Sequence, residues 1–295
     1  MSKKSILEQM IAILSLIFAV VLISIIAIPQ MLQALFRLIY CQRKEDIDGK
    51  LAIVTGGGSY FGRCIVQKLA ERGCNLVIVD DNLEKIERLA KEVRSENVKV
   101  SVYCTNTCDN QEVSELFDKV NEEFDDIDLL INIPQFMLNC ENDSSKLIAE
   151  KMSTSFNSTM IMTLKFLDKF KQQNNSSRIV SISSCAGLSN SLDFLSTDMT
   201  YNFMNSISDH LKERKLDKKI KMTCVLPCFV LNGQFITKYL NKFFKFNPVN
   251  VNLMADEIIR GITEQEKLIE IPNNFTNLTK FLMYIAKLIF FIIML

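Results

Sequence analysis

The sequence predicts an α/β protein built on a doubly wound parallel sheet. Short β-branched runs alternate with amphipathic helical patterns from about residue 49 to residue 272. A glycine-rich turn separates the first run from the first helical pattern, where nucleotide-binding sheets carry their phosphate loop. Apolar residues make up 48% of the 295 residues, enough for a substantial core. Because right-handed crossovers bring parallel strands to one edge, ligands are expected at the carboxyl ends of the strands.

The order of the elements supports this fold class. Seven strands are predicted, at residues 51–55, 75–80, 98–104, 127–132, 178–183, 220–226 and 267–272. Helices are expected between them, at residues 62–72, 82–95, 110–124, 145–172, 198–216 and 255–265. The second of these helices has acidic and basic residues four positions apart, a spacing that supports an exposed helical face. Strands and helices that alternate at this spacing predict βαβ units.

Both ends of the chain have membrane-like sequences. Residues 9–36 carry no charge, and the apolar run at 11–28 is long enough to cross a bilayer core as a helix. Pro29 leaves a hairpin within one leaflet as an alternative, while the length of the run disfavours a cleaved signal peptide. The apolar run at 281–295 is too short to span and favours a position at the membrane interface. We therefore expect a membrane anchor with a basic linker at 1–45, a globular domain at 46–275 and an apolar membrane-associated tail at 276–295.

Charge and cysteine usage exclude several classes of function. The 34 basic residues balance the 34 acidic ones, which disfavours nucleic acid as a partner, because that partner calls for a basic face. Nine cysteines without a C-x-x-C pair indicate neither a zinc site nor a disulfide framework. The single histidine, His210, excludes His-based metal clusters, and no G-x-S-x-G elbow marks a Ser-His-Asp hydrolase. Reduced cysteines and the basic residues after the apolar segment favour a cytosolic globular domain.

The turn TGGGSYFG, residues 55–62, lies where a phosphate-binding loop belongs. Glycines permit a tight turn and let the amides of the following helix face a pyrophosphate. Asp80 ends the second strand, 24 residues after Gly56. Its carboxylate can accept hydrogen bonds from an adenosine ribose, and it would repel a 2′-phosphate. This pattern predicts NAD rather than NADP as the cofactor.

With these features the chain resembles the short-chain dehydrogenase/reductase family, whose Rossmann-like loop reads T-G-x-x-x-G-x-G. The segments GKLAIVTGG, LVIVDDN, KMTCVLPCFV and ITEQEKLIEIP carry a closer similarity to its membrane- and lipid-droplet-associated 17-beta-hydroxysteroid and retinol dehydrogenases. The resemblance implies a nicotinamide cofactor and a lipophilic alcohol or ketone substrate of the retinoid or steroid class. It also implies pairing through two long helices, as a homodimer or with a paralogue, and a location at the endoplasmic reticulum membrane or at lipid droplets.

The family's cofactor positions are matched in part. The resemblance assigns cofactor contacts to Thr55, Gly56, Gly58, Tyr60, Phe61, Gly62, Asp80, Asn106, Asn132, Pro227 and Asn232. Tyr60 replaces the middle glycine of the loop, and is expected to crowd the pyrophosphate or to need an unfavourable backbone conformation. Asn106 replaces an adenine-contacting aspartate, and Asn232 replaces a threonine. The family's NNAG segment here reads NIPQ, beginning at Asn132.

The catalytic helix departs further from the family pattern. In the family a serine, a tyrosine and a lysine four residues after the tyrosine act together. The serine position is Ser184, and thirteen residues later the tyrosine position falls on Thr197 and the lysine position on Tyr201. An aliphatic hydroxyl is no acid or base near neutral pH, and no ammonium is in place to lower a phenol's pKa from about 10. A second alignment, shifted by four residues, makes Tyr201 the acid and gives it the uncharged Asn205 as partner.

We therefore expect a membrane-anchored homologue with a degenerate active site and weak or no NAD-dependent dehydrogenase activity. Two alternatives stay open. One is an active NAD-dependent oxidoreductase in which Tyr201, or a water held by Ser184, moves the proton. The other is a non-catalytic protein of lipid surfaces. The family's supporting asparagine falls near Ser155, with Asn157 two residues away.

Overall fold

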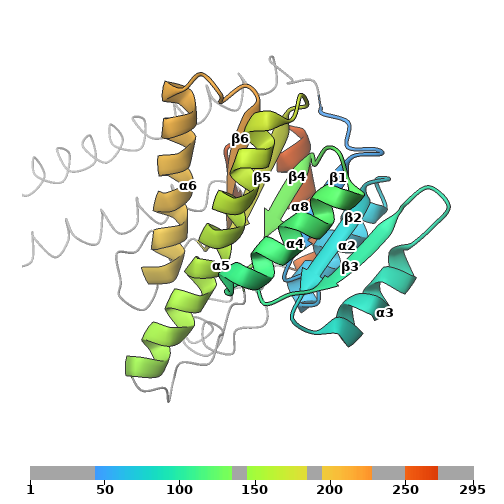
Figure 1. The fold of residues 1–295 in the computed structure, drawn as a ribbon, viewed down its shortest axis with the longest axis horizontal. Helices are drawn as coiled ribbons and strands as arrows, with labels where there is room; N and C mark the ends of the chain where they lie inside the picture. Colours follow the sequence, from blue (N-terminus) through green and yellow to red (C-terminus); the bar gives the residue numbers. More distant parts are fainter. Residues whose placement is uncertain (1–43, 135–144, 185–194, 228–249, 272–295) are drawn as a thin grey trace, which may run out of the picture. The chain divides into compact units, whose positions relative to one another are not determined.

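The computed structural model describes residues 44–134, 145–184, 195–227 and 250–271. From Glu45 onward the chain forms a compact unit around a seven-stranded parallel sheet of order β3-β2-β1-β4-β5-β6-β7 (Figure 1). The strands are β1 (Leu51–Thr55), β2 (Asn75–Asp80), β3 (Val100–Cys104), β4 (Leu129–Asn132), β5 (Ser177–Ile182), β6 (Ile220–Pro227) and β7 (Leu268–Ile271). The predicted doubly wound parallel sheet is confirmed.

Six helices connect these strands within the described residues. They are α2 (Tyr60–Ala70), α3 (Leu83–Val93), α4 (Asn110–Glu123), α5 (Ser145–Gln172), α6 (Leu195–Glu213) and α8 (Val251–Thr263). The sequence prediction placed the start of α8 too late, at residue 255. The helix begins after Asn250, whose side chain accepts a hydrogen bond from the amide of Asn252 and so caps it.

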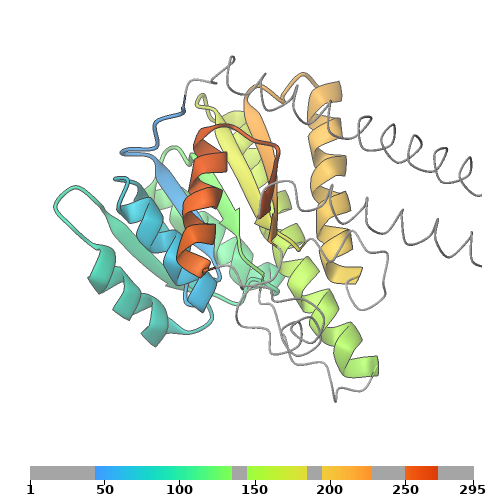
Figure 2. The same ribbon diagram turned by 180° about the vertical axis from the view of Figure 1, so that it is seen from behind.

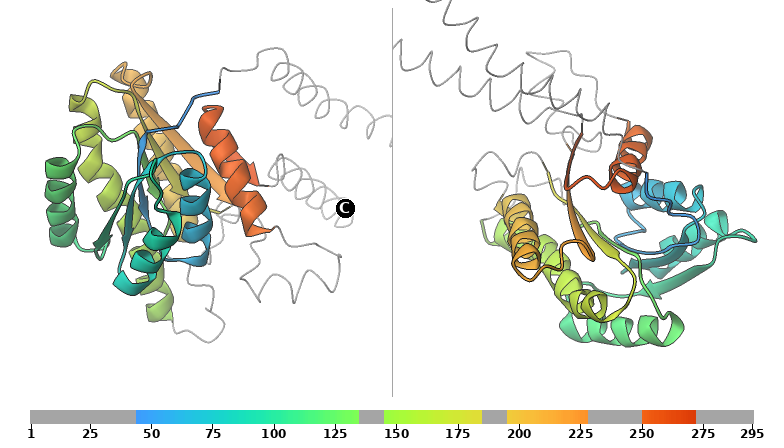
Figure 3. Two further views of the ribbon diagram at one scale, coloured as in Figure 1. Left: turned by 90° about the vertical axis from the view of Figure 1, so that its right-hand side faces the viewer. Right: turned by 90° about the horizontal axis from the view of Figure 1, so that it is seen from above.

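The helices form two layers, one on each face of the sheet (Figures 2 and 3). Helices α2, α3 and α8 cover one face, with Ile65 and Ile258 fully buried there. Helices α4, α5 and α6 cover the other, around Phe166 and Phe170. Strands β1 to β3 run outward in one direction and β4 returns to the far side of β1. The connections that leave the carboxyl ends of β1 and β4 therefore run in opposite directions along the sheet. This is a topological switch point, where sheets of this kind bind ligands.

Within the described part of the chain, no helix is both long enough and apolar enough to cross a membrane. The predicted anchor at residues 9–36 and the apolar tail at 276–295 lie outside the described residues. The same holds for Asn232.

Candidate nucleotide-binding site

The turn after β1 approaches the end of β4 so closely that only glycine fits at two positions. Gly56 has a left-handed backbone, with φ of +65°, and a Cβ there would lie 2.4 Å from the carbonyl oxygen of Ile133. A Cβ on Gly62 would lie 2.1 Å from the carbonyl oxygen of Gly56. The hydroxyl of Thr55 accepts a hydrogen bond of 3.2 Å from the amide of Ile133. These contacts hold the turn at the switch point between β1 and β4.

The first turn of α2 presents backbone amides to the space beside the glycine turn. Ser59 caps the helix: its hydroxyl accepts a 3.0 Å hydrogen bond from the amide of Gly62 and donates a 2.7 Å bond to the carbonyl of Gly56. Among the described residues, the amides of Tyr60 and Phe61 have no acceptor. Unpaired amides at a helix N-terminus, together with the helix dipole, are suited to a pyrophosphate.

Asp80 lies beside the glycine turn at the end of β2, and it is 8% exposed. Its Oδ2 accepts a 2.9 Å hydrogen bond from the amide of Gly58, and its Oδ1 accepts a 3.1 Å bond from the amide of Asn82. Burial raises the pKa of Asp80 above its ordinary value, although these two amide bonds favour the charged form. The carboxylate is thus held in place next to the loop, where an adenosine ribose would meet it.

Tyr60 does not need the unfavourable backbone conformation that its place in the loop suggested. It is the first residue of α2, and the described non-glycine residues with positive φ are Lys215 and Gln265. Its side chain is 60% exposed. The turn is formed by the three glycines and Ser59 and is complete before Tyr60. A residue with a side chain therefore fits at the first helical position.

The other predicted cofactor residues also stand at the carboxyl edge of the sheet. Asn106 is exposed after β3, and its side-chain oxygen accepts a 3.1 Å hydrogen bond from the amide of Cys108. Asn132 is buried at the end of β4 and donates a 3.0 Å hydrogen bond to the hydroxyl of Thr163 on α5. Pro227 is buried at the end of β6, where it pairs with Ile271 of β7.

The register of α6 against β5 places the catalytic-helix residues. The hydroxyl of Ser181 donates a 3.2 Å hydrogen bond to Sδ of Met204, which fixes one point of contact. From that point Ser184 lies three residues along an extended strand, about 10 Å away. Helix α6 runs back against the strand direction, so Thr197 lies seven residues along the helix, again about 10 Å away. Thr197 is therefore level with Ser184, and Tyr201 lies one turn deeper.

Tyr201 is partly buried and packs against the core beneath the sheet face. No hydrogen bond joins its hydroxyl to Ser184 or to any other residue that the structure describes. Asn205, the partner in the shifted alignment, is exposed to solvent. The nearest cationic side chain further along α6 is Lys212, eleven residues on, where it pairs with Asp209.

Two functional candidates were missed by sequence reasoning. Ser59 orders the glycine turn, and the preference for serine at helix N-caps could have identified it. Thr159 and Thr163 are buried on α5 and continue a polar stripe from the half-buried Ser155, at intervals of four residues. The hydroxyl of Thr159 and the side-chain oxygen of Asn132 are buried and have no hydrogen-bond partner among the described residues. The four-residue spacing was visible in the sequence, but its burial was not.

Comparison with known proteins places this geometry in a family. The short chain dehydrogenase model matches residues 50–241. Human 17-beta-hydroxysteroid dehydrogenase 13 is 26% identical over 284 residues, which covers 91% of each chain, and zebrafish (Danio rerio) retinol dehydrogenase 10-B is 28% identical, covering 78% of this chain and 76% of its own. A short-chain dehydrogenase/reductase of Burkholderia phymatum, solved with NAD, superposes with a TM-score of 0.61 at 20% identity, over 76% of this chain and 89% of its own. With its glycine turn, its parallel sheet and the match over most of the domain, this chain belongs to the short-chain dehydrogenase family.

Proposed function

We propose that the protein is a membrane-anchored short-chain dehydrogenase homologue that binds NAD and has weak or no dehydrogenase activity. The observation that carries the proposal is the contrast between two parts of one edge of the sheet. The glycine turn, the open amides of α2 and the carboxylate of Asp80 fit a dinucleotide. The catalytic helix, in contrast, has no lysine one turn after a tyrosine.

The nucleotide half of the proposal is supported by how the residues fit the group. A Cβ on Gly58 would lie 2.9 Å from Cγ of Asp80, so glycine keeps the space between loop and carboxylate. The carboxylate has lone pairs left for ribose hydroxyls after accepting two amide bonds, and it disfavours the 2′-phosphate of NADP. A bound nicotinamide would accept or supply a hydride, and this chain's residues would have to move the accompanying proton.

The catalytic half of the proposal concerns that proton. Thr197, at the tyrosine position of the unshifted alignment, has only an aliphatic hydroxyl, and Tyr201, four residues further along α6, packs against the core. General acid–base catalysis accounts for about 10²–10⁴-fold of an enzyme's rate. Its loss predicts turnover of a lipophilic alcohol or ketone that is slower by about this factor, even with NAD bound.

The proposed membrane attachment is supported by the sequence of residues 9–36 and by the relatives. The similarity extends over 91% of this chain and 91% of human 17-beta-hydroxysteroid dehydrogenase 13, which is more than the described sheet domain alone. We propose attachment to the endoplasmic reticulum membrane or to lipid droplets, with the domain in the cytosol. Leu164 on α5 and Met199 on α6 are 45% and 40% exposed, which suits pairing of two copies or of paralogues through these helices.

The test is calorimetric titration of the detergent-solubilised full chain with NAD and NADP, followed by turnover with a panel of retinols and steroids. We expect NAD to bind more tightly than NADP, with turnover weak or absent. Asp80→Asn should weaken NAD binding, whereas Glu87→Gln, which alters an exposed acid on α3, should leave it unchanged. Rapid turnover that Tyr201→Phe abolishes would instead establish the active-enzyme alternative. Failure to bind either nucleotide would leave the lipid-surface alternative.

A further inference from the structure

Three helices end in the same backbone arrangement at the amino edge of the sheet, the edge opposite the candidate site. In each, two amides after the helix turn back to carbonyls of its last turn, and the closing residue has a left-handed backbone. The closing residues are Gly73 after α2 (φ 77°), Lys215 after α6 (φ 59°) and Gln265 after α8 (φ 61°). Glycine is the preferred residue at such a position, so the two side chains are held there against a local steric cost.

The side chain of Gln265 makes a contact within the domain that explains its presence. The side chain of Lys215 needs a different explanation. Oε1 of Gln265 accepts a 2.8 Å hydrogen bond from Nζ of Lys221. Lys215 is exposed, and no ion pair is formed by it within the described residues. A residue retained in a sparsely populated conformation is a reason to look for a function of its side chain.

Lys215 belongs to a segment that we call the basic edge, residues 212–221, which joins α6 to β6. It has six basic residues and two acidic ones, Glu213 and Asp217. Lys212, Arg214, Lys215 and Lys218 are exposed. The basic edge therefore carries a net positive charge in a protein whose total charge is zero.

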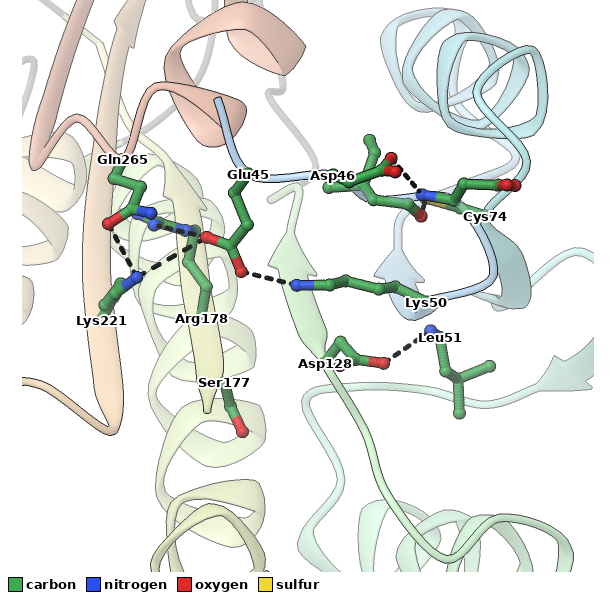
Figure 4. A network of polar contacts seen from close by, with 12 residues as sticks. Glu45, Asp46, Lys50, Leu51, Cys74, Asp128, Ser177, Arg178, Lys221 and Gln265 are labelled. Atoms are coloured by element: carbon green, nitrogen blue, oxygen red, sulfur yellow. Dashed lines mark hydrogen bonds and ion pairs between the residues drawn. The ribbon is translucent and has the colours of Figure 1, made fainter. Parts of the chain in front are cut away.

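Glu45 ties the start of the domain to this same edge. Its carboxylate contacts Nζ of Lys50 at 2.6 Å, Nη2 of Arg178 at 3.5 Å and Nζ of Lys221 at 3.6 Å (Figure 4). Its amide donates a 2.8 Å hydrogen bond to the carbonyl of Thr263. Glu45, the first residue of the domain, therefore lies beside the amino ends of β5 and β6.

That connection limits the distance between the basic edge and the proposed anchor. Eight residues lie between Phe36, the end of the uncharged stretch, and Glu45, which makes nine steps along the chain. A fully extended chain covers at most about 3.5 Å per residue, so the tether is shorter than about 32 Å. A bilayer that holds the anchor thus lies within reach of the basic edge.

Two strands further along the same sheet edge, at the amino end of β4, the charge is opposite. Residues 122–128, which lead from α4 into β4, include five acidic residues and no basic one. An anionic surface attracts the basic edge and repels this acidic segment, whereas a neutral surface distinguishes them little. The charge distribution is therefore suited to setting the orientation of the domain on an anionic bilayer.

We propose that the basic edge binds the headgroups of anionic phospholipids and so fixes which side of the domain lies against the membrane. This inference rests on the membrane attachment proposed above. It names the lipid class and the residues that meet it, chiefly Lys215 and Lys218. Basic residues near an anionic leaflet each strengthen binding by roughly fivefold, an effect that falls off within about 10 Å at moderate salt.

The experiment uses the full chain reconstituted into vesicles of phosphatidylcholine alone or with phosphatidylserine. Acylation rates of single lysines are measured by mass spectrometry. We expect Lys215 and Lys218 to react several-fold more slowly in the phosphatidylserine vesicles, with the difference lost at high salt. Lys85 and Lys91, exposed on α3, serve as controls and should react equally in both.

A double variant separates lipid binding from folding. The variant combines Lys215→Gly with Lys218→Gln. Lys215→Gly removes a charge and also the steric cost of a side chain on a left-handed backbone, so the melting temperature should not fall. We expect this variant to lose most of the phosphatidylserine-dependent protection of Lys212, whereas Lys85→Gln with Lys91→Gln should retain it. If Lys215 and Lys218 react equally in both vesicle types while the protein co-floats with both, membrane attachment stands and the role of the basic edge is overturned. Failure to float with either vesicle would instead remove the anchor and this inference with it.

Discussion

The amide of Gly58 donates a 2.9 Å hydrogen bond to Oδ2 of Asp80, and this bond joins the glycine turn to the end of β2. The amide of Asn82 holds the other carboxylate oxygen at 3.1 Å. The carboxylate is therefore positioned before any ligand arrives, which lowers the cost of ordering it on binding. The first two predictions follow from this relationship.

NAD binding should weaken as the pH falls, with a midpoint above that of an ordinary aspartate. Burial raises the pKa of Asp80, so the group favours the folded state at low pH and loses that contribution as the pH rises through its folded pKa. Ribose hydroxyls donate hydrogen bonds to the ionised carboxylate. The affinity for NAD should therefore rise with pH, while the contribution of Asp80 to folding stability falls. Calorimetric titration of NAD across the acid range measures this. The pH step should vanish in Asp80→Asn, and its persistence there would assign it to another group.

Gly58→Ala should reduce NAD affinity by roughly tenfold, about the value of one charge-assisted hydrogen bond. The new methyl group would lie 2.9 Å from Cγ of Asp80 and push the carboxylate away from the loop. Gly49→Ala is the matched control: Gly49 has a φ of +70° and no atom within 4 Å of an added Cβ. That variant should lose some stability and keep its affinity for NAD. An unchanged affinity in Gly58→Ala would contradict a ribose contact by Asp80.

The double substitution Thr197→Tyr with Tyr201→Lys should create dehydrogenase activity. It places a phenol level with Ser184 and an ammonium one helical turn further along, where its charge lowers the pKa of the phenol. We expect a gain of about 10²-fold or more in the turnover of a lipophilic alcohol, measured by NADH formation. Either substitution alone should give little. If Tyr201→Lys alone abolishes an existing activity, Tyr201 is the acid and the shifted alignment holds.

Glu45→Gln should destabilise the domain by about 1–2 kcal/mol at neutral pH, because partial exposure reduces the value of a hydrogen bond to a charged group. Burial opposes ionisation of Glu45, but the hydrogen bond from Lys50 and the charges of Lys50, Lys221 and Arg178 outweigh it, so its pKa is lowered. This stabilisation is present above the ordinary pKa of glutamate and is lost as the pH falls through the lower folded pKa.

Urea unfolding at neutral and acidic pH checks this sign. The difference between Glu45→Gln and the unmodified chain should shrink below about pH 4, where free glutamate becomes protonated. Glu71→Gln is the control, since Glu71 is 61% exposed and its pair with Lys68 is at the surface. A difference that grows toward acidic pH would mean that the three cations do not stabilise ionised Glu45.

The sequence alone determined the fold class, and it predicted where the candidate site lies. Alternation of apolar runs and helical patterns fixed the order of the elements, because each period must match a buried face. Gly56, Gly62 and Asp80 were recognisable because a tight turn and a ribose contact each restrict the residue type. The start of α8 was misplaced because the prediction began at residue 255 and did not recognise Asn250 as the helix cap.

Tertiary structure decided the questions that depend on distance across the chain. The contact of Ser181 with Met204 gives the register of α6 against β5, which no local pattern in the sequence contains. The backbone of Tyr60 could not be predicted, because Ser59 and the preceding glycines share the turn with it. Glu45 meets Arg178 and Lys221 from positions more than one hundred residues away in sequence. Local patterns specify periodicity and turn chemistry, whereas such pairings exist only once packing has brought distant strands together.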